Sequence, residues 1–143
     1  MNQINSKRRK PPIIIGDHDL ERLTRLASAA PVSASAIADE LLAELDRART
    51  RAQHAVPGNV VRMGSLVTFR TGDGTEKTVQ LVYPNEADIE HGRVSVLTPI
   101  GTALIGLAEG QSIGWQDRFG KSHELAVMTV RQPQDADAVA EQA

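Results

Sequence analysis

Carboxylates and histidines are the side chains of this sequence that could perform chemistry. Asp39 and Glu40 form an adjacent acidic pair, but neighbouring residues of a helix point about 100° apart, so the pair cannot clamp one metal ion. The histidines lie at no metal-binding spacing; they are His18, His54, His91 and His123. No base accompanies any serine, and there is no cysteine. The sequence therefore predicts no catalytic residue, no metal site and no cofactor.

The stretch 97-LTPIGTALIGLAEGQSIGW-115 has the most pronounced local pattern. Thr98 can cap a helix through its side-chain oxygen, and the helix predicted over Pro99–Leu107 begins with a proline, which suits the first position. Gly106 and Gly110 can adopt left-handed backbone where the chain turns. A Gly-Lys-Ser/Thr sequence is missing, so the glycines do not predict a phosphate loop.

Two amphipathic segments precede this stretch and predict a helical hairpin. Apolar residues recur at helical spacing over about 17–30 and again from 33 or 35 to about 52, and the short break between them contains Pro31 and Val32. Helices joined so closely should be antiparallel and bury their apolar faces together. The second helix would be about 30 Å long. Its acidic half, with Asp39 and Glu40, would project, and its basic half would form a joint with the rest of the protein through Arg47, Arg49 and Arg51.

Beyond 56-VPGN-59 the pattern changes to strands, which are predicted over 60–63, 66–70, 77–83, 93–97, 112–116 and 124–130. With one short helix after the fourth strand, the predicted class is α+β. The expected organisation is a basic flexible N-terminus over 1–12, a hairpin arm over 13–56, an antiparallel sheet domain over 57–131 and a disordered tail over 132–143.

Composition limits the setting and the size of the protein. A chain of 143 residues has room for one modest core. The absence of cysteine favours an intracellular protein, and the apolar run 13-III-15 is too short for a signal or a membrane span. We expect a cytoplasmic monomer without membrane contact.

The glycine-containing stretch resembles the C-terminal signature of the Gre family of transcription elongation factors. The signature residues are Thr98, Pro99, Gly101, Ala103, Leu104, Gly106 and Gly110. The segments 13-IIIGDHDLERL-23, 44-ELDRAR-49 and 81-LVYP-84, with the short hairpin, are most similar to the Rnk branch, named as regulators of nucleoside diphosphate kinase. The resemblance extends from about Pro12 to Arg131. Thr98 replaces the usual Ser, and Gln111 replaces an acid.

The resemblance implies an FKBP-like domain that carries a shortened coiled-coil arm. It also implies docking at the rim of the secondary channel of bacterial RNA polymerase, with the arm entering the channel and nucleic acid nearby only within the transcription complex. Cleavage factors of the family carry acids at the tip of a long arm to hold a second magnesium ion, whereas 29-AAPVSAS-35 has no charge. The expected function is a polymerase-binding regulator, not an enzyme, that competes with Gre-type factors.

Two other functions are considered. The first is active stimulation of transcript cleavage through Asp39 and Glu40. The second is an FKBP-type prolyl isomerase or a generic protein-binding module. An isomerase needs an aromatic-lined cleft, and the chain offers only Phe69, Tyr83, Trp115 and Phe119.

Overall fold

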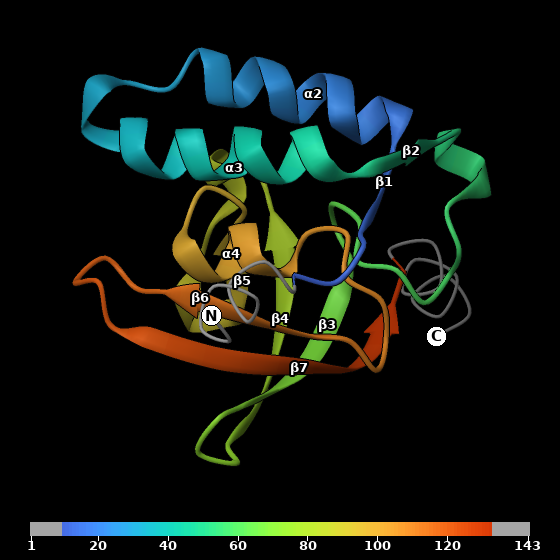
Figure 1. Ribbon diagram of the computed structural model, residues 1–143, viewed down its shortest axis with the longest axis vertical. Helices are drawn as coiled ribbons and strands as arrows, with labels where there is room; N and C mark the ends of the chain where they lie inside the picture. The colour runs from blue at the N-terminus through green and yellow to red at the C-terminus, as the bar shows by residue number, and fades with distance from the viewer. Residues whose placement is uncertain (1–9, 133–143) are drawn as a thin grey trace, which may run out of the picture.

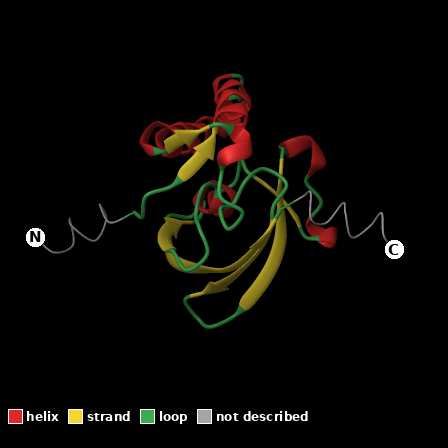
Figure 2. Ribbon diagram, turned by 90° about the vertical axis from the view of Figure 1, so that its right-hand side faces the viewer, coloured by secondary structure: helices red, strands yellow, loops and turns green. Residues whose placement is uncertain are grey.

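A helical hairpin lies across a curved sheet domain in the computed structural model, which describes residues 10–132 (Figures 1 and 2). The hairpin region comprises β1 (Ile14–Gly16), α2 (Asp17–Ser28), η1 (Val32–Ala34), α3 (Ser35–Arg47), β2 (Arg49–Arg51) and η2 (Gln53–Ala55). The domain comprises β3 (Leu66–Thr71), β4 (Glu76–Val82), η3 (Pro84–Glu86), η4 (Ile89–His91), β5 (Arg93–Ser95), α4 (Pro99–Leu104), β6 (Ser112–Gln116) and β7 (Ser122–Arg131). The predicted α+β class is confirmed.

The hairpin forms because each helix has one apolar face. Leu23 and Ala27 of α2 and Leu41 and Leu45 of α3 are buried in the same core cluster. The two helices run antiparallel, as predicted, and α3 is the one nearer to the sheet domain (Figure 1). α3 also contacts α4. The hairpin therefore packs onto the domain along α3, and the predicted projecting arm is corrected in this respect.

The prediction of a second helix of about 20 residues is wrong. α3 ends at Arg47 after 13 residues, and Ala48 is already extended. Arg49–Arg51 then forms a strand that pairs in parallel with Ile14–Gly16, and Arg49 N donates to Ile13 O at 2.9 Å. A longer helix would leave the backbone N–H and C=O groups of β1 without partners. Pairing of β2 with β1 satisfies these groups, and α3 ends at Arg47. Arg47 therefore ends a helix, whereas Arg49 and Arg51 lie on a strand.

The side chain of Gln53, at the start of η2, binds the first turn of α2. The N-cap residue of α2 is Gly16, which has no side chain to cap the helix. The Asp17 carboxylate instead accepts from Gln53 N at 3.0 Å, and Gln53 Oε1 accepts from Asp19 N at 2.9 Å. Gln53 thus satisfies a free N–H of the first turn and joins the two ends of the hairpin.

The five-stranded sheet has the order β5-β4-β3-β7-β6. Its pairs are antiparallel except β4 with β5, which is parallel, so the sheet is mixed and the antiparallel prediction needs this correction. The strand predicted over 60–63 does not form, and within this segment Val60 makes only an isolated bridge with Ala108. Val61 N donates to Leu107 O at 2.8 Å, so this segment is hydrogen-bonded to the turn after α4 and not to a strand of the sheet.

One apolar core joins the hairpin to the domain. Phe69, Leu81 and Leu104 are buried in the same cluster as Leu23 and Leu41. Gln132 was assigned to the tail, yet it is buried, and its amide binds Gly58 O and Val60 O at 2.8 and 2.7 Å. The rest of the predicted tail and residues 1–9 lie outside the described residues. The FKBP-like and coiled-coil descriptions remain predictions.

Candidate protein-binding face

The signature sequence builds a short helix whose start is accessible. Thr98 Oγ1 accepts from Gly101 N at 3.1 Å and donates to Ser95 O at 2.7 Å. Pro99 occupies the first turn, so the predicted cap and proline position are confirmed. The helix ends at Leu104, three residues before the predicted end, because Ile105 leaves helical geometry with ψ 129°.

Most of the signature is interior and serves the fold. Gly101, Ala103, Leu104 and Gly106 are all buried. A Cβ at Gly101 would lie 2.2 Å from Ser95 O, so only glycine allows α4 to approach the end of β5 this closely. Gly106 has φ +82° and packs against Ile13. Of the signature residues, only Thr98, Pro99 and Gly110 retain accessible surface for a partner.

An open hollow of about 800 Å³ lies beside the start of α4. Ile100 of the helix, Trp115 of β6 and His123 of β7 contribute to its wall. The Trp115 and His123 rings stack with centroids 4.6 Å apart and planes inclined by 23°. Lys77, Lys121, Asp73 and Glu124 also line the hollow, so its apolar wall has charged neighbours of both signs. Hollows of this composition suit the side chains or an extended segment of a partner protein.

The turn between β3 and β4 forms another edge of the hollow and contains an unusually acidic carboxyl. The Thr71 hydroxyl donates to Asp73 Oδ1, and Thr75 N donates to the same oxygen at 3.0 Å. These hydrogen bonds, with that of Thr71 the largest cause, lower the pKa of Asp73 from 3.8 to about 2.

This carboxyl gives a pH prediction. Because the pKa is lower in the folded state, the turn is favoured above the ordinary value of 3.8, and that contribution is lost as the pH falls towards about 2. A carboxyl NMR titration should place the Asp73 midpoint near 2. Thr71→Val should return the midpoint towards 3.8, since it removes the hydroxyl donor. A wild-type midpoint near 3.8 would contradict the assigned hydrogen bonds.

The remaining aromatic side chains do not complete an aromatic cleft. Phe69 is fully buried in the core. Tyr83 lies at a separate groove of about 470 Å³ between α2 and η3, where Arg22 Cζ is 4.4 Å from its ring centroid. Burial, and then the nearby Asp19 carboxylate, raise the pKa of Tyr83. Only Trp115 of the four aromatic residues lines the hollow.

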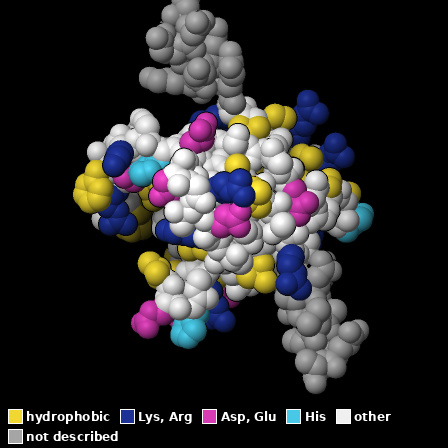
Figure 3. All heavy atoms as spheres, turned by 90° about the horizontal axis from the view of Figure 1, so that it is seen from below, with side chains coloured by type: hydrophobic (Ala, Val, Ile, Leu, Met, Phe, Trp, Pro, Cys, Tyr) yellow, Lys and Arg dark blue, Asp and Glu magenta, His cyan; other side chains and the backbone are white. Residues whose placement is uncertain are grey.

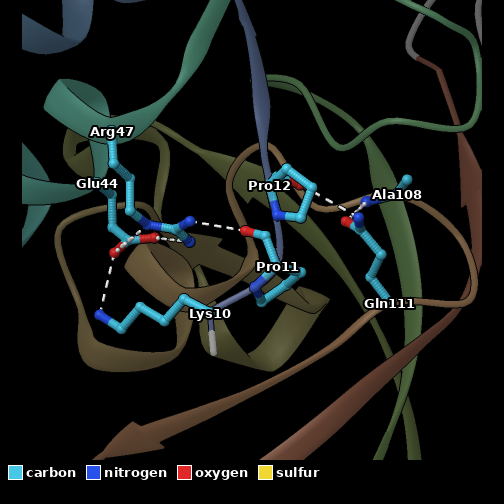
Figure 4. A network of polar contacts seen from close by, with 7 residues as sticks. All are labelled: Lys10, Pro11, Pro12, Glu44, Arg47, Ala108 and Gln111. Carbon is cyan, nitrogen blue, oxygen red and sulfur yellow. Dashed lines mark hydrogen bonds and ion pairs between the residues drawn. The ribbon is translucent and has the colours of Figure 1, made fainter. Parts of the chain in front are cut away.

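The joint predicted from three arginines is built mainly by one of them (Figure 4). Glu44 is buried, and Arg47 binds it through two hydrogen bonds, Nη2–Oε1 at 2.8 Å and Nε–Oε2 at 3.1 Å. Arg47 Nη1 also donates to Pro11 O at 2.6 Å, and Lys10 Nζ reaches Glu44 at 3.1 Å. Arg49 and Arg51 are exposed. The network fixes residues 10 and 11, which the sequence had placed in a flexible segment.

Gln111 provides a second attachment for the N-terminal segment. Its Oε1 accepts from Ala108 N at 2.9 Å, and its Nε2 donates to Pro12 O at 3.2 Å (Figure 4). A carboxylate could accept the first bond but could not donate the second. The departure from the family signature at this position therefore exchanges a charge for a contact with Pro12.

The hairpin tip is apolar and accessible. Pro31 and Val32 are both exposed, and Val32 has 91% of its surface accessible. Asp39 and Glu40 are exposed on α3. Within residues 10–132, no group of three or more histidine or acidic side chains is arranged to hold a metal ion. The structure thus places the two acids on the helix surface, away from the tip turn.

Comparison with known proteins defines the class to which these features belong. Residues 56–132 match the family described as "Transcription elongation factor, GreA/GreB, C-term", and residues 11–50 match "Rnk N-terminus". The chain therefore belongs to the Gre family. Within it, the combination of the two matches assigns the chain to the Rnk branch.

Relatives named as kinase regulators and relatives named as elongation factors both agree with this assignment. The chain is 40% identical over 129 residues to "Regulator of nucleoside diphosphate kinase" of Escherichia coli (strain K12), covering 89% of this chain and 95% of the relative. It is 41% identical over 75 residues to "Transcription elongation factor GreA" of Rhodospirillum rubrum, covering 49% of this chain and 48% of that protein. The chain thus spans about half of this elongation factor but nearly all of the first relative.

A solved structure supports the fold over most of the chain. It is the "Prokaryotic transcription elongation factor GreA/GreB from Nitrosomonas europaea", with a TM-score of 0.67 and 36% identity, covering 85% of this chain and 99% of that one. In the described part of the chain, every helix is too short or too polar to cross a membrane.

Proposed function

We propose that this protein is a transcription regulator that binds bacterial RNA polymerase at the rim of the secondary channel and does not stimulate transcript cleavage. Its family membership supports the partner, since relatives in the same family are named transcription elongation factors. The observation that carries the proposal is a Gre-type domain joined to a short hairpin whose exposed tip lacks a carboxylate.

The docking face that we propose consists of the start of α4 and the adjoining hollow. Thr98 and Pro99 are partly exposed at the helix start, and Ile100 of the next position lines the hollow with Trp115. The buried part of the signature fixes this helix against β5 and so presents a rigid surface. A face of this kind binds without reorganisation of the backbone, which limits the entropic cost of association.

The geometry of the hairpin supports the absence of cleavage activity. A second magnesium ion needs oxygen ligands at about 2.1 Å. The residues between α2 and α3 carry no charge, and Asp39 lies four residues, or about 6 Å along the axis, from the start of α3 at Ser35. α3 has 13 residues, corresponding to about 20 Å, and packs on the domain through α4. The carboxylates are therefore set back from the tip of an already short hairpin.

A cleavage assay on backtracked transcription complexes tests this function. The full-length protein should bind the complexes without increasing RNA cleavage, and should inhibit an added Gre-type cleavage factor in proportion to its occupancy. Asp39→Asn/Glu40→Gln should behave in the same way. Cleavage by the wild-type protein that disappears in this double variant would favour an active cleavage factor instead. Wild-type protein that fails to bind polymerase would refute the proposed partner.

An isomerase function receives less support from the structure. Its substrate cleft would need several aromatic walls, whereas Phe69 is buried, Tyr83 lines another groove and the hollow has only Trp115. Turnover of a proline-containing peptide would test this alternative, and we expect none.

A further inference from the structure

The turn between β6 and β7 is held in one conformation by a single carboxylate. Asp117 Oδ1 accepts from Phe119 N at 2.9 Å and from Lys121 N at 3.0 Å. Asp117 Oδ2 is 2.9 Å from His123 Nε2, and His123 stacks on Trp115 in the wall of the hollow. Backbone bonds from Gly120 N to Asp117 O and from Asp117 N to Lys121 O close the turn. The turn is thus tied to the proposed docking face.

This ordered turn carries the most exposed aromatic side chain of the described residues. Phe119 has 88% of its surface accessible, although removing a phenylalanine side chain from water is favourable. Its backbone is fixed by Asp117, so the exposure does not come from a turn without internal bonds. A large apolar group presented on a rigid turn has the properties of an interface anchor, because little backbone freedom is lost when it is buried.

The charges around Phe119 indicate the surface that would receive it. Arg118 and Lys121 flank it and are exposed. The carboxylate of Asp117, the acid in this turn, is already hydrogen-bonded to the backbone of the turn and to the His123 ring. Figure 3 shows hydrophobic side chains between Lys and Arg side chains at the left edge of the molecule, the end at which the β6–β7 turn lies in Figure 1.

We propose that Phe119 is an anchor that inserts into an apolar pocket of RNA polymerase whose edge carries carboxylates, with Arg118 and Lys121 facing those carboxylates. This inference rests on the proposed function, because it adds a second contact beside the α4 face to the same partner. Lys121 and His123 line the hollow, so the anchor and the hollow form one surface. The basic flanks would accelerate association and make it sensitive to salt.

The test is a binding titration of full-length protein to bacterial RNA polymerase. Phe119→Ala should weaken binding by about thirtyfold, the effect of a typical interface anchor, while the melting temperature stays unchanged because the side chain is exposed. Ile89→Ala is the matched control, since Ile89 is 86% exposed on η4, and its affinity should equal that of the wild type. Arg118→Gln/Lys121→Gln should reduce the dependence of affinity on salt.

The outcomes separate the anchor from the proposed function. Equal affinity of Phe119→Ala and wild type would overturn the anchor while leaving polymerase binding intact. Failure of the wild type to bind would overturn the proposed function and the anchor together. Sedimentation of both proteins tests another occupant of this surface: a wild-type dimer that becomes monomeric in Phe119→Ala would show that Phe119 binds a second copy of this chain, and would also overturn the proposal.

Discussion

Gly101→Ala should destabilise the protein by about 3 kcal/mol or more, lowering its melting temperature on the order of 10 °C. The added methyl carbon would lie 2.2 Å from Ser95 O, 2.8 Å from Val96 Cα and 3.0 Å from Ser95 C. All three are backbone atoms at the end of β5, so no side-chain rotation relieves the contact. α4 would have to shift, which would strain the bond from Thr102 Oγ1 to Val96 O, now 2.9 Å. The gain in helix propensity, about 1 kcal/mol, is too small to compensate.

Gly58→Ala is the matched control for this substitution. A Cβ at Gly58 meets no atom within 4 Å, and this residue is not among the glycines with positive φ. Its melting temperature should remain within about 2 °C of the wild type. Thermal unfolding followed by circular dichroism measures both variants. If Gly101→Ala has the same melting temperature as Gly58→Ala and the wild type, the close approach of α4 to β5 is not required for stability.

Arg47→Met should remove about 2 to 4 kcal/mol of stability. The substitution keeps a long apolar stem but removes both hydrogen bonds to Glu44 and the bond to Pro11 O. The Glu44 side chain is only 5% exposed, so its carboxylate would be left buried. Lys10 alone would then face it, from a side chain that is 47% exposed. A buried charge without adequate partners is expensive, whereas the loss of an exposed ion pair is not.

Arg25→Met provides the comparison, because it removes an ion pair of the same chemistry on the helix surface. Arg25 and Glu21 are 3.3 Å apart, with side chains 70% and 72% exposed. Its loss should change stability by less than about 0.5 kcal/mol. Glu44→Leu/Arg47→Met should recover much of the stability lost in Arg47→Met, since no buried charge remains. Chemical denaturation of the four proteins measures these differences. Equal stabilities of Arg47→Met and Arg25→Met would refute the buried network.

Local sequence signals predicted the features that depend on neighbouring residues. Thr98 and Pro99 defined the start of α4 because capping and proline geometry act within one helical turn. Strand β6 was predicted at its observed bounds, and Gly106 and Gly110 both have the expected positive φ. These features give the class of the fold and the accessible end of the signature helix.

Features that depend on distant residues were not predicted. Arg49–Arg51 continues an apparent helical period, and only its pairing with Ile14–Gly16 makes it a strand. The polar sequence around Gln132 suggested a tail, but its amide is bound by backbone carbonyls more than seventy residues away. The candidate site was affected in the same way. The hollow brings together β3, β4, α4, β6 and β7, and no single segment indicates it.

The attachments of residues 10–14 also have a consequence for biosynthesis. Pro12 O is bound by a residue 99 positions later, and Ile14 N donates to Gly106 O at 3.2 Å. The contacts of residues 10, 11 and 13 with Glu44, Arg47 and Arg49 join segments at most 36 residues apart, whereas those of Pro12 O and Ile14 N cannot form until the signature turn has been made. At about 5 to 20 residues per second, the interval between completion of the hairpin and synthesis of Gln111 is roughly 3 to 11 s. During most of that time α3 has no α4 to pack against, and a segment made late in translation completes the attachment of one made early.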